Sequence, residues 1–297
     1  MRVTQLAAFK KLKQNLAKNR EALAKYQQEV STGKRVTKAS DGSVAFATSR
    51  HIKNAMRKNQ QYQSNINSGL SKAQTAESAL NSMIDTLSNF KSTAISGATD
   101  TLTKQNRQNL ADKVNGMKKR IVSLANTKFN GEYLFGGTNT SQKPFSLNST
   151  ATGGVSDTSN GKNLKTQISD ISNVSVSVTG KALRNTSAGD LFSIMQNVET
   201  ALRNNNPSAI SNNLDAINKA YNHVTNLTSN IGNHINRLQF KKKQLKSQNI
   251  NQKGDVSQLV DANIANVMMN VQKYEISYKA ALSVHSRIIK TSLVNYL

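Results

Sequence analysis

The chain contains no cysteine and no tryptophan, and it holds only two prolines and few aromatic side chains. The absence of cysteine excludes disulfide bonds, thiolate metal sites and cysteine nucleophiles. Aromatic residues make up 5% of the 297 residues, which argues against a thick core and favours a thin, elongated structure. Because the prolines are Pro144 and Pro207, the first 143 residues and the last 90 permit long uninterrupted helices.

Long hydrophobic runs are also missing. No apolar stretch approaches the roughly 20 residues that a transmembrane helix needs. The first residues, MRVTQLAAFKKLKQ, are charged and lack the apolar segment of a signal peptide. We therefore expect no membrane insertion and, if the protein leaves the cell, export without a cleaved signal peptide.

Acidic residues are scarce, since 16 Asp and Glu stand against 40 Lys and Arg and leave a formal net charge of +24. Such an excess implies attraction to nucleic acid, anionic lipid or an acidic surface. The cations are scattered, however, and the only run of three consecutive lysines is Lys241–Lys243. Scattered lysines are typical of solvated faces. A basic nucleic-acid-binding coiled coil is therefore an alternative that a strong salt dependence of nucleic-acid binding would support.

Apolar residues recur at spacings of three and four in five segments, which predicts helices that pack along narrow seams. The three inner segments span residues 66–94, 110–124 and 210–245, and polar Asn19 interrupts the first seam. Because a narrow seam needs partners beyond one chain, the first and last segments are predicted to form an assembly interface. The residues of this predicted interface are Phe9, Leu12, Leu16, Leu23, Tyr26, Val30, Ile264, Val267, Val271, Tyr274, Tyr278, Leu282, Ile289, Leu293, Tyr296 and Leu297.

The middle of the chain breaks the helical pattern, because eight of the fifteen glycines lie between residues 131 and 189. An Asn-Gly turn dipeptide precedes Glu132–Phe135, which predicts a strand. A second strand is predicted over Ile168–Val178, where apolar and polar residues alternate through Ile171. Ser146–Lys165 is poor in apolar residues, and we expect a loop or a small, poorly cored insert there.

These patterns predict a mainly α fold. Both chain ends are expected to form an elongated antiparallel helical coiled-coil rod, with a small β-hairpin and loop region in the middle. The predicted domains are a terminal coiled-coil domain, a helical rod domain and a small β/loop insert. They occupy residues 1–40 with 255–297, residues 41–136 with 185–254, and residues 137–184, respectively.

No catalytic constellation stands out. The chain has no phosphate-binding glycine loop, no dinucleotide fingerprint and no zinc-protease motif. Of its four histidines, His223 and His234 are eleven residues apart and could share a helix face, but no carboxylate completes a metal site at a suitable spacing. We therefore expect no enzymatic activity, no metal and no cofactor.

Several stretches resemble one family. Ser31–Val36 (STGKRV) with Ala39–Asp41 resembles a signature of flagellin-like proteins, and Ile231–Leu238 is similar to a stretch shared across flagellins. Residues 131–145 (GEYLFGGTNTSQKPF) and the end at 286–297 (SRIIKTSLVNYL) are similar to the hook-associated protein 3 family of the flagellar hook–filament junction.

The resemblance implies a structural subunit of the bacterial flagellum that forms the junction between hook and filament. Such a subunit would be extracellular, exported unfolded through the flagellar type III channel. It would assemble into a ring between a neighbouring hook-associated junction protein and flagellin, with its terminal helices as an inner tube. An export chaperone would hold the C-terminal helix, and neither nucleic acid nor a membrane would be a partner. Flagellin itself is the alternative within the class, although filament flagellins lack the block over residues 133–144.

Overall fold

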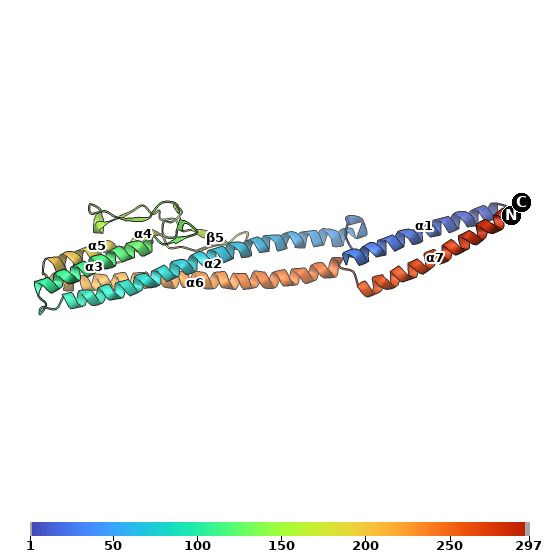
Figure 1. Cartoon of the computed structure of the whole chain (residues 1–297). Helices are drawn as coiled ribbons and strands as arrows, with labels where there is room; N and C mark the ends of the chain where they lie inside the picture. Colours follow the sequence, from blue (N-terminus) through green and yellow to red (C-terminus); the bar gives the residue numbers. More distant parts are fainter. Residues whose placement is uncertain (1, 295–297) are drawn as a thin grey trace. The chain divides into compact units, whose positions relative to one another are not determined.

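The computed structural model describes the backbone of residues 2–294 and the side chains of residues 7, 9–284 and 286 (Figure 1). Within these residues the chain is mainly α-helical with short strand pairs in its middle, as the sequence predicts. Contacts divide it into two compact units, residues 1–58 with 247–297 and residues 59–246. The three-domain division stays a prediction. The α-helices are α1 (Arg2–Thr32), α2 (Ser43–Gly97), α3 (Lys104–Ala125), α4 (Gly180–Arg184), α5 (Leu191–Arg203), α6 (Pro207–Val260) and α7 (Ile264–Val294).

In the first unit, α1 and α7 pack side by side (Figure 1). The rings of Tyr26 and Tyr274 stack between them with centroids 5.4 Å apart, and Val267 is buried. The three-and-four spacing gives each helix one apolar stripe, which favours this pairing. A pair of helices covers each stripe from one side only. Most of the seam side chains are therefore half-buried rather than buried.

A backbone clamp joins the end of α1 to the start of α7. The amide of Arg35 donates to the carbonyl of Val260 at 2.8 Å, and the amide of Ala262 donates to the carbonyl of Gly33 at 2.9 Å. Gly33 has a φ of +66°, the left-handed conformation in which glycine commonly ends a helix. The STGKRV stretch therefore has a structural role, because it ends α1 and fixes the chain beside the start of α7.

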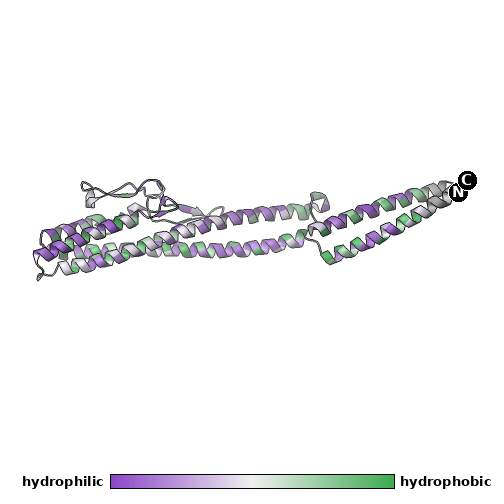
Figure 2. Ribbon diagram, viewed as in Figure 1, coloured by the Kyte–Doolittle hydropathy of each residue, from purple (hydrophilic) through white to green (hydrophobic). Residues whose placement is uncertain are grey.

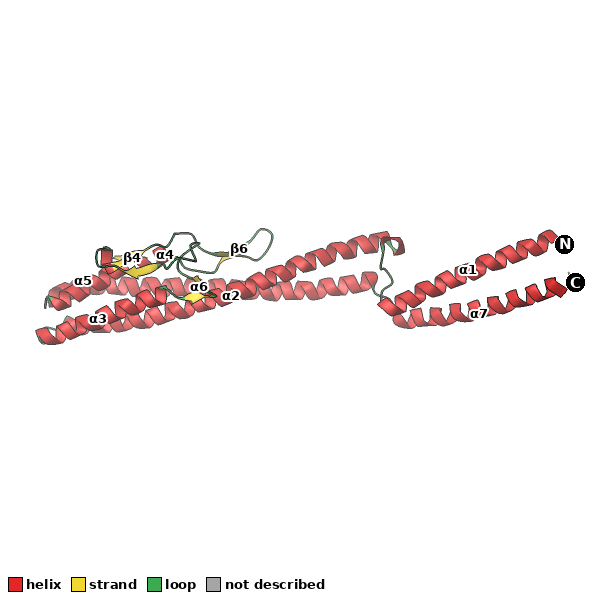
Figure 3. Ribbon diagram, turned by 45° about the horizontal axis from the view of Figure 1, so that its top comes forward, coloured by secondary structure: helices red, strands yellow, loops and turns green. Residues whose placement is uncertain are grey.

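In the second unit, α3 and α5 pack against each other and share one core with α2 and α6 (Figure 3). α5 is not among the five predicted helical segments, although it lies inside the predicted rod domain (residues 185–254). It begins at the N-cap Asp190, whose carboxylate accepts a hydrogen bond from the amide of Ser193 at 2.8 Å. The large, fully buried side chains of these helices include Ile66, Leu80, Met83, Leu87, Phe90, Ile121, Leu191 and Phe192.

Arg107 of α3 is a buried cation that satisfies the end of α2. Its guanidinium donates to the carbonyls of Gly97, Thr99 and Leu102 at 3.0, 2.6 and 2.9 Å. It also donates to the side-chain oxygen of Asn205, ahead of α6, at 2.6 Å. Carbonyls at a helix end lack partners within the helix. One side chain thus completes the α2–α3 turn and ties it to the α5–α6 turn.

A second buried cation joins α3 to α5. The ammonium of Lys118 lies 3.0 Å from the carboxylate of Glu199, and both side chains are buried. Arg203 contacts Glu199 at 3.1 Å and the exposed Asp112 of α3 at 2.8 Å. Both carboxylates favour the charged guanidinium and raise the pKa of Arg203 above its usual value. The ion pairs fix the register between the two helices, because a shift would leave the buried charges without partners.

The described middle of the chain forms four two-stranded antiparallel hairpins on the second unit (Figure 3). The first follows the Asn-Gly turn, where Asn130 and Gly131 have φ of 49° and 83°. The strand pairs are β1 (Lys128–Phe129) with β2 (Glu132–Tyr133), β3 (Phe145–Leu147) with β4 (Val155–Asp157), β5 (Lys165–Gln167) with β6 (Asn173–Ser175), and β7 (Asn185–Thr186) with β8 (Gly189–Asp190).

Both predicted strands are longer than the observed ones. The first ends at Tyr133, and the second is reduced to β6, with Ile171 97% exposed in the turn before it. The chain after β6 packs on α2, and only one further backbone hydrogen bond, from the amide of Val176 to the carbonyl of Leu164 at 3.0 Å, extends the pairing with β5 among the described residues. A Cβ added at Gly69 of α2 would lie 3.2 Å from the side chain of Val176. The alternation of apolar residues therefore reflects packing on a helix over most of its length.

The expectation of a loop or poorly cored insert over residues 146–165 is wrong in part. This stretch contains β4 and a short 3-10 helix (Thr152–Gly154), and Val155 is fully buried. At its start, Phe145 packs against Phe192 of α5 with ring centroids 5.6 Å apart. The side-chain amide of Asn126 hydrogen-bonds both the amide and the carbonyl of Phe145, at 3.0 and 2.8 Å. The insert is thus anchored on the helices by side chains that its own composition does not reveal.

Candidate assembly surface on the terminal helices

The predicted interface residues lie on the helix pair α1 and α7, along which hydrophobic and hydrophilic residues intermix (Figure 2). Most of those whose side chains are described remain partly open to water. Val267 is buried, whereas Phe9, Ile264 and Leu282 are exposed. The side chains of Ile289 and Leu293, and residues Tyr296 and Leu297, lie outside the described residues. The half-buried members are Leu12, Leu16, Leu23, Tyr26, Val30, Val271, Tyr274 and Tyr278.

α7 carries a second, discontinuous apolar face that the sequence analysis missed, with exposed Gln272 and Lys273 between its two apolar residues. Met269 is 61% exposed and Ile276 is 69% exposed. Each follows a seam residue, Val267 or Tyr274, by two positions, which on a helix is a rotation of about 200°. The two side chains therefore lie opposite the side that packs on α1. The spacing of seven between them was the signal that could have identified this face.

The described side chains of α1, residues 7 and 9–32, form no such second face. The side chains away from its seam are mainly polar and basic, and all of the following are exposed: Lys10, Lys11, Lys13, Lys18, Arg20 and Lys25. A helix that is apolar on one side suits a surface, whereas a helix that is apolar on opposite sides suits a buried position. The described parts of the two terminal helices are therefore chemically unequal, because α7 exposes apolar side chains on two sides and α1 exposes mainly polar and basic ones on its outer side.

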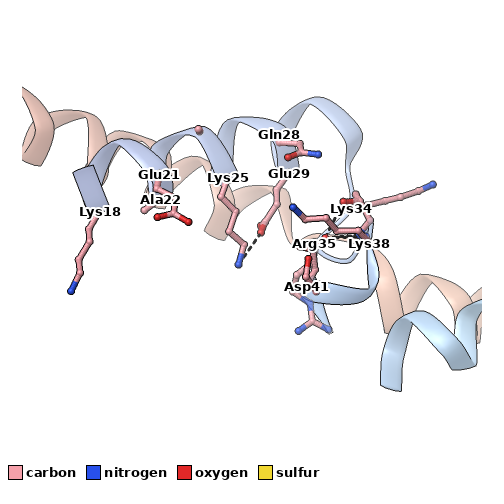
Figure 4. Close-up of a pocket in the computed structure, with 13 residues that line it drawn as sticks. Lys18, Glu21, Ala22, Lys25, Gln28, Glu29, Lys34, Arg35, Lys38 and Asp41 are labelled. Carbon is pink, nitrogen blue, oxygen red and sulfur yellow. Dashed lines mark hydrogen bonds and ion pairs between the residues drawn. The ribbon is translucent and has the colours of Figure 1, made fainter. Parts of the chain in front are cut away.

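A mixed-charge hollow of about 650 Å³ lies beside the C-terminal half of α1 (Figure 4). Glu29 is buried in it, with the ammonium of Lys25 4.0 Å from its carboxylate. Asp41 accepts hydrogen bonds from the amides of Thr37 and Lys38 at 3.0 and 3.1 Å, and these bonds lower its pKa. These two carboxylates are thus held by neighbours in the chain, while Glu21 lines the hollow as an exposed side chain. The hollow presents mainly ammonium and guanidinium groups to solvent.

Neither histidine that was considered for a metal site has metal-binding surroundings. Nε2 of His223 lies 2.6 Å from the carbonyl of Ala182. His234 is half-buried, and desolvation, with a smaller contribution from Arg237, lowers its pKa below 6.5. Within the described residues there is no group of three or more potential metal-ligating His, Cys, Asp or Glu residues. No described helix combines the length and apolarity needed to cross a bilayer.

Comparison with known families assigns both ends of the chain. The N-terminal helical region of bacterial flagellin matches residues 3–140, and the C-terminal helical region matches residues 214–297. The chain belongs to the flagellin family. In this flagellin-family chain the matched regions contain α1 and α7 with both faces of α7, while most of the β hairpins lie between them.

The similarity to individual relatives is either limited to part of the chain or low in sequence identity. The flagellin-family chain is 32% identical to flagellar hook-associated protein 3 of Escherichia coli (strain K12) over 123 residues, 41% of this chain and 39% of that protein. It is 23% identical to a flagellin of Listeria monocytogenes over 95% of this chain and 93% of the relative. The chain spans less than half the length of the hook-associated relatives that it matches.

The fold also has a solved counterpart. A flagellar hook-associated protein from Vibrio parahaemolyticus superposes with a TM-score of 0.67 at 18% identity. The match covers 74% of this chain and all of that one. At this identity the likeness concerns the fold.

Proposed function

We propose that the chain is a structural subunit of the bacterial flagellum that forms the junction between hook and filament. The flagellin-type regions at both ends support a flagellar subunit. The stretch over residues 131–145 and the match to hook-associated protein 3 favour the junction over the filament. The observation that carries the proposal is the second apolar face of α7, which one chain leaves in water and an assembly of chains would bury.

The energetics favour such an assembly. Burying one exposed side chain such as Met269 or Ile276 gains roughly 1.5–3 kcal/mol. The gain per subunit is modest, but in a closed ring every subunit makes the same contacts. Many small apolar contacts along long seams would then hold the structure together, in the manner of coiled coils. The basic outer side of α1 would stay hydrated.

The finer architecture belongs to the same proposal. Residues 1–40 and 255–297 would form an inner tube, residues 41–136 and 185–254 a helical shell around it, and residues 137–184 a small outer insert. The ring would sit between a neighbouring hook-associated junction protein and flagellin, in an extracellular position. Before export without a cleaved signal peptide, a chaperone would cover the apolar side of α7, because an exposed apolar face invites association. The proposed function is structural, with no enzymatic step and no cofactor.

A filament subunit is the second candidate. Its support is the match to a Listeria flagellin over almost the full length of both proteins. The two candidates differ in where the protein lies and in how much of it is present. A junction subunit would occupy one short zone, and a flagellin would run along the whole filament.

Immunogold electron microscopy of the native flagellum separates these candidates. A junction subunit predicts label confined to the hook–filament boundary, and a deletion strain whose hooks carry no filament. Label along the entire filament would contradict the assignment to the junction and favour a flagellin. Normal flagella and motility in the deletion strain would contradict both.

A further inference from the structure

A basic groove in the second unit is lined by side chains of α2 and α6, two helices that run side by side in this unit (Figure 1). Its volume is about 510 Å³. On one side stand Lys242, Lys243 and Lys246, which include two of the three consecutive lysines at 241–243. The other lining residues are Asn67, Leu70, Ser71, Gln74 and Gln239. Leu70 is buried, while the remaining side chains offer amides and a hydroxyl.

The positive charge of the groove is not neutralised by acidic side chains in its lining. None of its lining residues is acidic, and none of the three lysines forms an ion pair with a described residue. Other cations of this unit are paired within the chain, as Lys72 is with Glu132 at 2.6 Å and Lys118 with Glu199, whereas exposed cations such as Lys113 and Lys119 lie on helix surfaces outside this groove. Three adjacent ammonium groups in one concave surface focus a positive potential that an anionic ligand would neutralise.

A second copy of this chain does not supply that anion. The sequence has 16 acidic residues against 40 basic ones, and several of the acidic residues are already held by partners in their own chain. Asp190 is paired with Arg184, Asp215 with Lys219, and Glu132 with Lys72. No dense acidic run matches the lysines, so the complementary partner is chemically different from this protein.

The lining chemistry also separates two classes of anionic polymer. Proteins that bind single-stranded nucleic acid stack the bases on aromatic side chains. No aromatic residue lines the groove, and the exposed Phe240 does not contribute to it. Asn67, Gln74 and Gln239 both donate and accept hydrogen bonds, as does Ser71. Such groups suit the hydroxyls of a sugar, while lysines suit its carboxylates or phosphates.

We infer that this groove is a binding site for an acidic polysaccharide. The lysines of α6 hold the anionic groups, and the amides of α2 and α6 hold the neighbouring sugar hydroxyls. The site is independent of the proposed assembly through α7. It accounts for a basic cluster that neither the fold nor the assembly requires.

Binding of polygalacturonate to the full chain, measured by titration calorimetry at about 150 mM salt, tests this inference. The groove variant is Lys242→Gln/Lys243→Gln/Lys246→Gln. The matched control is Lys113→Gln/Lys119→Gln/Arg120→Gln, which removes the same charge from exposed positions on α3. Circular dichroism confirms the fold of both. We expect the groove variant to lose affinity roughly tenfold and the control less than about twofold.

Two further measurements make the result specific to sugars. Asn67→Ala/Gln74→Ala should weaken polygalacturonate binding while leaving the binding of inorganic polyphosphate unchanged. Equal losses in the groove and control variants would overturn the site in favour of diffuse charge attraction. Tighter binding of an oligothymidylate than of polygalacturonate would overturn it in favour of nucleic acid. Absence of binding to polygalacturonate would refute it directly.

Discussion

Tyr26 and Tyr274, one near each end of the chain, stack with their ring centroids 5.4 Å apart and their planes inclined by 23°. They are separated by almost the full sequence, so their contact fixes the register of α1 against α7. Both rings are only half-buried. The pair therefore combines a specific contact with open apolar surface, which is the combination that a subunit awaiting neighbours needs.

The stacking should be measurable as a coupling energy. Aromatic pairs contribute about 0.5–1.5 kcal/mol beyond the burial of their area. A double-mutant cycle of Tyr26→Ala and Tyr274→Ala should give that coupling, read from amide hydrogen exchange of α1 and α7. The matched cycle of Tyr26→Ala with Tyr278→Ala, which lacks the stacked geometry, should be additive. Additivity in both cycles would show that the rings contribute by burial alone.

Arginine is usually an exposed residue type, but Arg107 is buried. Its replacement should therefore have a large effect on the stability of the second unit. Arg107→Ala removes donors from three carbonyls and from Asn205. Leaving such groups without partners should lower the free energy of unfolding of the second unit by about 2–4 kcal/mol. Urea denaturation gives the value. Arg120→Ala, at an exposed position of the same helix, should change stability by less than about 0.5 kcal/mol.

Replacing each of two glycines by alanine should change the stability of the second unit in opposite directions. Gly137 has a φ of +71°, and an added Cβ would collide with Asn160. Gly137→Ala should therefore destabilise the second unit by about 2–4 kcal/mol, since strain and overpacking add. Gly116 lies inside α3 with nothing within 4 Å of an added Cβ. Gly116→Ala should stabilise by roughly 0.5–1 kcal/mol. Thermal melts that moved in the same direction would contradict the local geometry.

The helices were predictable because their apolar period repeats over many turns. The seam residues from Ile210 to Leu245 all fall on α6, where Ile217, Val224 and Ile231 are buried. α5 could also have been found. Leu191, Ile194, Val198 and Leu202 follow the capping Asp190 at helical spacing.

The middle of the chain and the second face of α7 were harder to predict from the sequence, for a physical reason. Strand signals describe alternation, and alternation also arises when an extended chain packs on a helix, as Val176 does at Gly69. On α7, the pattern of a single apolar seam does not include the exposed Met269 and Ile276. The second stripe has no partner among the described residues of the chain, so its only signal in the sequence is the spacing of seven between these two residues.

Stability should fall on mild acidification because of His234. Burial lowers its pKa in the folded state below the ordinary value of 6.5. Its contribution to stability is therefore fully present above pH 6.5 and declines as the pH falls toward the folded-state pKa, because the unfolded chain binds the proton more readily. His234→Gln should flatten the pH dependence of the urea midpoint between about pH 5 and 7. An unchanged slope in the variant would assign the effect to other groups.

The central claim is that the outer face of α7 joins neighbouring subunits, and one substitution tests it most directly. Ile276→Asp places a carboxylate on that face, where burial without a partner is strongly unfavourable. Gln14→Asp adds the same charge at an exposed position of α1. Both variants should keep the circular dichroism and urea stability of the isolated chain. Electron microscopy of flagella in a deletion strain complemented with each variant then gives the answer. The account predicts filaments on hooks with Gln14→Asp and bare hooks with Ile276→Asp, whereas normal filaments with Ile276→Asp would contradict it.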